Sequence, residues 1–173
     1  MKDAALTLGH THNIENQPEE LKDYNAYLSD TALQEAVRRE GAAWCIEELT
    51  EFGALMGKSE TIKLGYQANE YPPRLKTHDH LGRRIDEVEF HPAYHQLHEI
   101  DRQYAIHAGP WNNPAKGAHV KRAALGYMMN QVEASHCCPT TMTYASVPLL
   151  RDYPELAKIW LPLISNEFYD PRN

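Results

Sequence analysis

Apolar side chains recur every three to four residues along most of this chain, which is the period of an amphipathic helix. Residues 1–26 lack such a period and predict an extended N-terminal arm. Residues 29–31 are all helix N-cap types and precede apolar residues at helical spacing, so we expect one helix over 30–52. The same pattern predicts further helices over 59–69, 92–108, 118–132, 139–151 and 155–164.

The segment near residues 75–90 breaks this helical period. Two short runs, 75–78 and 84–90, flank a polar stretch that has Gly82 near its centre. A glycine between two short runs favours a tight turn that reverses the chain. We therefore expect one small β-hairpin within a mainly α domain of five to six helices, spanning residues 27–165.

Length and charge narrow the class of protein. The 173 residues suffice for one domain with a sizeable core, and 42% hydrophobic with 24% charged residues is an ordinary globular composition. The net charge of -7 argues against a broad nucleic-acid-binding surface. Three cysteines without a CxxC spacing predict a reducing, cytoplasmic setting. Residues 1–18 lack the apolar region of a signal peptide, and no apolar run approaches the roughly 18 residues that a membrane span needs.

The most informative stretch is 136–150, which joins two apolar helix patterns through Pro139. It places two cysteines, three threonines and one methionine near one helix junction. Sulfur side chains and small hydroxyls suit the wall of a mostly apolar pocket with a few polar points. The residues that we expect to border a concave, partly apolar surface are Met128, Gln131, Val132, Ser135, Cys138, Thr141 and Met142. Methionines at helical spacing also fit plain core, which is the alternative for Met128.

Three histidines in the predicted helix 92–108 and at its start raise the possibility of a metal site. His91, His95 and His98 are spaced i, i+4, i+7 and share one helix face. Such a face can bind zinc, with a fourth ligand from the hairpin turn at 78–80. The apolar face of the same helix lies about a third of a turn away. We therefore expect partly exposed histidines that flank the core, and we assign no metal ligand.

His136, Cys137 and Cys138 raise the possibility of a cysteine nucleophile beside its base. Neighbours in sequence seldom have the geometry for proton transfer, and no orienting Asp or Asn is evident. Small side chains at a tight helix junction are the favoured interpretation. The chain also lacks the GxGxxG, Walker, GxSxG and HExxH motifs, so no catalytic residue is assigned.

Several pieces spread over residues 24–169 are similar, in one order, to a single family. These pieces are Tyr27-Leu28-Ser29-Asp30, Gly82-Arg83-Arg84-Ile85-Asp86-Glu87-Val88, Phe90-His91-Pro92-Ala93-Tyr94-His95, Gln131-Val132-Glu133-Ala134, Cys138-Pro139 and Thr141-Met142-Thr143. In this combination the chain resembles the N-terminal helical domain of the alkylation-response (AidB-type) branch of the acyl-CoA dehydrogenases.

The resemblance implies a flavoprotein in which FAD lies between a middle β domain and a C-terminal helical bundle. The flavin-contacting segment would follow Asn173, residues 166–173 would begin the linker, and the catalytic base would lie in the bundle. This chain alone would then bind no cofactor and form one wall of the substrate channel and an assembly surface. Its partners would be the remaining domains and further copies in a tetramer, whereas any DNA contact would belong to the C-terminal part. The alternatives are a stand-alone binding or assembly module and a metal-dependent enzyme that uses the three histidines.

Overall fold

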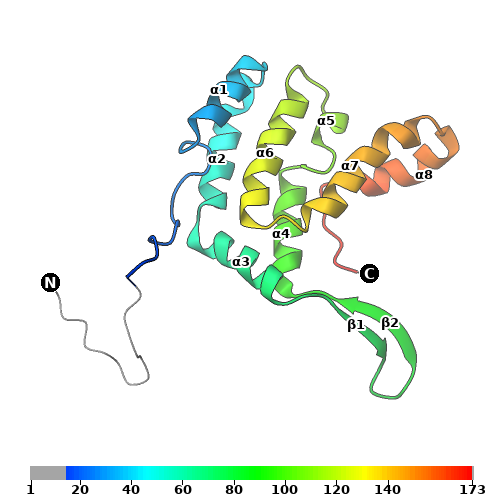
Figure 1. Ribbon diagram of the computed structural model, residues 1–173. Helices are drawn as coiled ribbons and strands as arrows, with labels where there is room; N and C mark the ends of the chain where they lie inside the picture. Colours follow the sequence, from blue (N-terminus) through cyan, green and yellow to red (C-terminus); the bar gives the residue numbers. More distant parts are fainter. Residues whose placement is uncertain (1–14, 173) are drawn as a thin grey trace.

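The computed structural model describes residues 15–172 and shows a helical bundle with two projections (Figure 1). The elements run in the order α1 (Thr31–Arg39), the 3-10 turn η1 (Ala43–Cys45), α2 (Ile46–Met56), α3 (Ser59–Glu70), β1 (Arg74–His78), β2 (Arg84–Glu89), α4 (Pro92–Gln103), α5 (Gly109–Asn112), α6 (Ala118–Val132), α7 (Cys137–Arg151) and α8 (Pro154–Ile164). The predicted mainly α fold with one small hairpin is confirmed. Within residues 15–172 there are eight α-helices rather than five to six.

One of the extra helices comes from a break within a predicted helix, and the other is α5, in a segment for which no helix was predicted. The predicted helix over 30–52 is interrupted at Gly41, whose φ of +84° lies in the left-handed region. A Cβ on Gly117 would lie 2.5 Å from the Gly41 carbonyl oxygen, so the backbone segments at Gly41 and Gly117 pass very close to each other. The helix predicted over 92–108 ends at Gln103, because Ala105 has a φ of +50°.

The hydrophobic core lies where α1, α2 and α6 meet the turn after α4. Figure 1 shows α6 running through the middle of the bundle, with α1 and α2 on one side and α5 on the other. The core residues are Ala26, Tyr27, Val37, Ala42, Cys45, Leu49, Phe52, Met56, Ile106, Ala124, Leu125, Met128 and Met129. Burial of these side chains supplies the main driving force for folding and holds α6 rigidly.

The predicted N-terminal arm, residues 1–26, lies partly outside the described residues. Residues 15–22 form neither helix nor strand. The backbone N–H groups of Tyr24 and Ala26 donate to the carbonyls of Gly57 and Gly53, at 3.3 and 2.9 Å. The end of this segment is therefore tied to α2 and leads the buried Tyr27 into the core.

Two projections extend from this bundle (Figure 1). Strands β1 and β2 pair antiparallel, with Arg74 opposite Glu89, and form an almost fully exposed hairpin. Helices α7 and α8 pack against each other as a second projection, which we call the α7–α8 arm. No residue of α8 is buried, although most of its side chains are apolar. In residues 15–172 no helix combines the length and the apolar character of a membrane span.

Candidate functional site

The turn between α6 and α7 is built around one buried carboxylate. Glu133 is only 3% exposed, and it accepts hydrogen bonds from the backbone N–H groups of Ser135 and His136, at 2.9 and 2.8 Å. It also accepts from the Ser135 hydroxyl and from Nδ1 of His136, the latter at 2.8 Å. Burial alone would raise the pKa of Glu133, but these hydrogen bonds outweigh it and hold the pKa at about 2. The turn therefore contains a permanent anion that fixes its backbone.

This carboxylate also orients the imidazole of His136, which the sequence analysis missed. Cys137 Sγ lies 3.8 Å from His136 Nε2, so a thiol, an imidazole and a carboxylate follow one another in space. The signal in the sequence is Glu133, three residues before the histidine, whereas the sequence analysis considered only Asp and Asn as residues that could orient His136. Burial, Asp101 and Glu133 raise the pKa of the Cys137 thiol to about 12. A thiol that stays protonated is a weak nucleophile, so the arrangement supports no catalytic role.

A second buried carboxylate connects α7 to α4. The Thr140 hydroxyl donates to Asp101 Oδ2 at 2.5 Å, and both residues are buried. Burial raises the pKa of Asp101, and the Thr140 hydrogen bond and the nearby Arg102 and Arg122 oppose that rise. The start of α7 is therefore anchored on the bundle, although the rest of the α7–α8 arm projects away from it.

A cavity of about 190 Å³, which we call the junction cavity, lies where α6 crosses the start of α7. Its lining residues are Ile106, Arg122, Ala123, Gly126, Tyr127, Asn130, Cys137, Thr140 and Thr141. A second cavity of about 200 Å³ lies below the turn and includes Glu133 and Ser135 with Tyr71 and Tyr94. The junction thus presents hydroxyl, amide and apolar groups to open space on two sides.

The predicted pocket residues fall into three places around this junction. Thr141 lines the junction cavity and Ser135 lines the second cavity. Met128 is instead a core side chain with no exposed surface, which is the alternative stated for it above. Val132 is half-buried against the core. The remaining three are exposed at the surface, namely Gln131, Cys138 and Met142, the last of them 69% exposed.

The three histidines of α4 have separate structural roles. His91 caps α4 by accepting from the Ala93 N–H at 3.1 Å. His95 Nδ1 lies 2.7 Å from the Tyr169 hydroxyl. His98 is buried against the His136 and Tyr169 rings, so the prediction of a partly exposed side chain was wrong for this residue. The spacing of the histidines places them on one face of α4, but it does not show that the α6–α7 turn covers His98.

The described residues do not form a metal centre from these histidines. Within 15–172, no three His, Cys, Asp or Glu side chains are grouped so that they could hold one metal ion. Burial lowers the pKa of His98 to about 4, and the neighbouring His136 and Arg102 add to that effect. His98 is thus a neutral packing residue of the buried polar network between α4 and the α6–α7 turn.

Comparison with known proteins decides the family. The family described as the adaptive response protein AidB N-terminal domain matches residues 16–171, nearly the whole chain. The chain belongs to this family. It is 44% identical over 161 residues to the putative acyl-CoA dehydrogenase AidB of Escherichia coli strain K12, covering 91% of this chain and 30% of that protein. The chain thus corresponds to the N-terminal domain of an AidB-like protein.

Solved structures show the same fold at lower sequence identity. Caenorhabditis elegans ACDH-11 in complex with C11-CoA matches with a TM-score of 0.75 and 20% identity, over 91% of this chain and 29% of that one. Bd2924 in its apo form matches with a TM-score of 0.76 and 21% identity, over 88% of this chain and 32% of that one. The chain therefore spans less than a third of the length of each of these three proteins.

Proposed function

We propose that this AidB N-terminal domain forms one wall of the substrate channel, and an assembly surface, of an FAD-dependent oxidoreductase of the acyl-CoA dehydrogenase type. The adaptive-response description of the family supports a further link to protection against DNA alkylation. The observation that carries the proposal is the uncovered apolar face of the α7–α8 arm, which begins beside the junction cavity.

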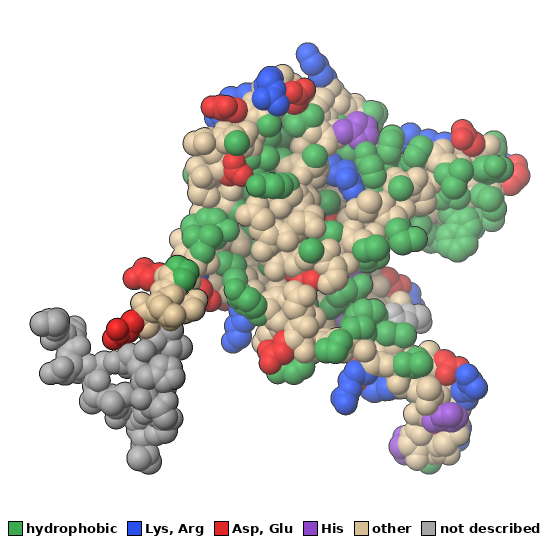
Figure 2. Space-filling model, in the orientation of Figure 1, with side chains coloured by type: hydrophobic (Ala, Val, Ile, Leu, Met, Phe, Trp, Pro, Cys, Tyr) green, Lys and Arg blue, Asp and Glu red, His purple; other side chains and the backbone are tan. Residues whose placement is uncertain are grey.

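The α7–α8 arm has the composition of a surface that another domain covers. Its exposed large apolar side chains, together with one just after it, are Met142, Leu149, Tyr153, Leu156, Ile159, Trp160, Leu163 and Phe168. Figure 2 shows hydrophobic side chains gathered on this projection. Contiguous apolar patches are rare on surfaces that face only water and mark interfaces. The remaining domains of a longer AidB protein, and further copies in a tetramer, are the partners that fit this role.

The junction cavity supports the substrate-wall part of the proposal. Thr141, in α7, lines the cavity. The exposed Met142 and Leu149, at the start of the apolar face, lie on the same helix. A ligand lying along α7 would meet hydroxyl and sulfur groups first and apolar groups further out. An acyl chain with a polar head has this order of chemistry.

We infer that FAD is held mainly outside the described residues. The cavities described above have volumes of about 190 to 230 Å³, whereas pockets for drug-sized ligands begin at roughly 300 Å³ and FAD is larger still. The flavin and the catalytic base are therefore assigned to the remaining domains, and no reaction step is assigned to this chain. We expect the purified chain to be colourless, which an absorbance scan of the flavin bands checks. Three free cysteines also fit the reducing, cytoplasmic setting that we infer.

A domain exchange tests the assembly role. Residues 16–171 replace the N-terminal domain of the Escherichia coli relative, and the flavin content and oligomeric state of the chimera are measured. We expect a flavin-loaded oligomer. Leu163→Asp, in α8, should lower the flavin-loaded, assembled fraction roughly tenfold or more, because a charge at a covered apolar site is costly. The matched control is Leu81→Asp at the hairpin tip, since Leu163 and Leu81 are 59% and 60% exposed. Equal flavin content in the two variants would rule out the arm as the assembly surface.

A further inference from the structure

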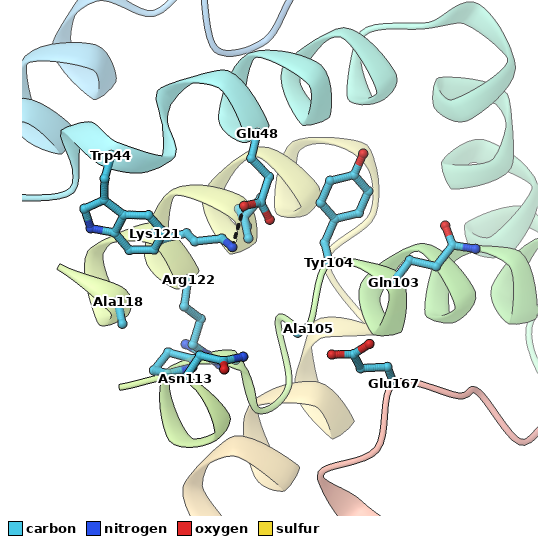
Figure 3. A pocket seen from close by; sticks show the side chains of 13 residues that line it. Trp44, Glu48, Gln103, Tyr104, Ala105, Asn113, Ala118, Lys121, Arg122 and Glu167 are labelled. Carbon is cyan, nitrogen blue, oxygen red and sulfur yellow. Dashed lines mark ion pairs between the residues drawn. The ribbon is translucent and has the colours of Figure 1, made fainter. Parts of the chain in front are cut away.

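The largest of the cavities described here lies away from the α6–α7 turn, toward the start of α6. It has a volume of about 230 Å³ and is bounded by η1, α2, α5, α6, the end of α4 and the segment after α8. Figure 3 shows its side chains around a shared opening, with Trp44 and Tyr104 on opposite sides. The Trp44 indole N–H donates to the Lys116 carbonyl at 2.9 Å, which fixes that wall in place. We call this space the Trp44 cavity.

Of the two cations that line the Trp44 cavity, Lys121 has an ion-pair partner and Arg122 has none among the described residues. Lys121 Nζ lies 2.6 Å from Glu48 Oε2, so this pair is neutral overall. Arg122 is half-buried, and burial lowers the pKa of its guanidinium without removing its charge. Its Nε donates to the Ile106 carbonyl at 2.9 Å, and its guanidinium carbon lies 3.6 Å from the centre of the Tyr144 ring.

The two terminal nitrogens of Arg122 are left with open donors. Among the residues that the structure describes, Arg122 has no ion-pair partner, and neither terminal nitrogen has a hydrogen-bond acceptor. In Figure 3 its side chain runs from α6 toward the α5 side of the cavity, where Asn113 lies. A half-buried guanidinium with open donors is less well hydrated than a fully exposed cation and therefore binds an anion more strongly.

We propose that the Trp44 cavity binds a small monocarboxylate with an aromatic or apolar body, its carboxylate held by Arg122. A guanidinium presents a planar fork of N–H donors that matches the two oxygens of a carboxylate. The body of the ligand lies between the Trp44 and Tyr104 rings, with Leu125 behind it. The volume of about 230 Å³ limits this body to one ring or a short chain.

The carboxylates around the cavity favour a monoanion over a phosphate. Glu167, from the segment after α8, lines the opening and has no ion-pair partner among the described residues. Glu48 also reaches the cavity, although Lys121 neutralises it. Glu167 would repel a dianionic phosphate ester about twice as strongly as a single carboxylate, so a monoanion at Arg122 is favoured. This site shares Arg122 with the junction cavity but is otherwise lined by different residues.

Binding of phenylacetate to the 173-residue chain tests the proposal. The probe is titrated while the Trp44 indole N–H is followed by NMR, with neutral phenylacetamide as the matched compound and phenyl phosphate as the dianion. We expect saturable shifts at Trp44 and Leu125 with phenylacetate and at least tenfold weaker binding of phenylacetamide. Shifts centred on Tyr127 and Thr141 would move the ligand to the junction cavity and overturn the proposal, as would equal binding of acid and amide or no saturation at millimolar concentrations.

Variants of the charged residues identify the groups involved. Arg122→Gln should weaken phenylacetate binding roughly 10- to 100-fold, Arg122→Lys should weaken it less, and Arg39→Gln on exposed α1 should leave it unchanged. Glu167→Gln lies outside the helices and should selectively tighten phenyl phosphate binding. If Arg122→Gln does not fold, the phenylacetate affinity of Arg122→Lys and the phenyl phosphate affinity of Glu167→Gln test the site instead. If neither affinity changes, the assignment is overturned.

Discussion

Glu133 shows how one side chain holds the α6–α7 junction. Helix α6 ends at Val132 and α7 begins at Cys137, so the backbone N–H groups of the turn between them need acceptors. The Glu133 carboxylate accepts from Ser135 and His136 at once. A buried anion with this many donors is stabilising, whereas a neutral replacement would leave donors unpaired.

Glu133→Gln should therefore destabilise the fold by about 2–4 kcal/mol. The amide keeps one acceptor oxygen but places an NH₂ group against N–H donors. Urea unfolding followed by circular dichroism measures the change in the free energy of unfolding. The control is Glu87→Gln on the exposed strand β2, which should change stability by less than about 0.5 kcal/mol. Equal effects of the two substitutions would contradict the anchoring role of Glu133.

Two buried histidines make stability depend on pH. Burial lowers the pKa of both His98 and His107 to about 4. The nearby Arg102 adds to the effect at both, and His136 adds to it at His98. The unfolded chain binds these protons near pH 6.5. Folding stability is therefore full above about pH 6.5 and is lost as the pH falls from there toward 4. Glu133 extends the loss from about pH 4.5 toward 2, because its folded pKa is also depressed.

His107→Gln should flatten this pH dependence. We expect the free energy of unfolding of the unsubstituted chain to drop by roughly 1–3 kcal/mol per histidine between pH 7 and pH 4.5. The variant should lack the part of this drop that His107 causes. Urea unfolding at several pH values measures the drop. His80→Gln, in the exposed hairpin turn, should keep the full slope. An unchanged slope in the His107 variant would mean that this imidazole titrates normally in the folded chain.

At the scale of secondary-structure elements, close packing of α3 on α6 positions the junction. A Cβ on Gly65 would lie 2.1 Å from the carbonyl oxygen of Val132, the last residue of α6. Only a glycine permits this approach, although Gly65 lies inside a helix where glycine is unfavourable. The end of α6, and with it the α6–α7 turn, is therefore held against α3.

Gly65→Ala and Gly126→Ala should have opposite effects on stability. The first should destabilise the fold by about 1–3 kcal/mol, because the new methyl group meets backbone. The second adds a methyl group 4.0 Å from the Ile106 side chain, so helix propensity should stabilise the fold by about 0.5–1 kcal/mol. Thermal unfolding of both variants measures the difference. A neutral or stabilising Gly65→Ala would contradict the close α3–α6 approach.

At the scale of the whole molecule, charge and shape indicate different partners for different surfaces. The chain carries a net charge of -7, and two cations of the projecting hairpin are paired with acids, Lys76 with Glu89 and Arg84 with Asp86. Residues 74–89 contain four Lys or Arg and four Asp or Glu, so the hairpin is a weak site for a polyanion, whereas the uncovered face of the α7–α8 arm is apolar. The arm is suited to protein contacts and the hairpin surface to water.

We expect no useful binding of duplex DNA by this chain at physiological salt. DNA affinity comes largely from cations that displace counterions, and here acids outnumber Lys and Arg by 24 to 17. Fluorescence anisotropy of a labelled duplex at low and at physiological salt measures binding. A submicromolar Kd that weakens steeply with salt would contradict this expectation.

The sequence alone determined the helical class, the hairpin and the family, because these depend on local period and on ordered motifs. The helix start at Pro92 was predicted correctly, since a proline fits the first turn of a helix. The start expected at Pro139 was wrong, because α7 begins two residues earlier, at Cys137. The breaks at Gly41 and Ala105 were missed, because a positive φ is imposed by the chain crossing and the turn around them.

Only the tertiary structure decided which side chains of the junction share a space. The helical period places Met128 and Thr141 on helices, but it does not show that the core covers the first and the junction cavity meets the second. The surroundings of Arg122, which stacks on Tyr144 and donates to Ile106, likewise depend on how α6 packs against distant segments of the chain. Burial and pairing are properties of contacts between distant segments, so a pattern along one segment cannot specify them.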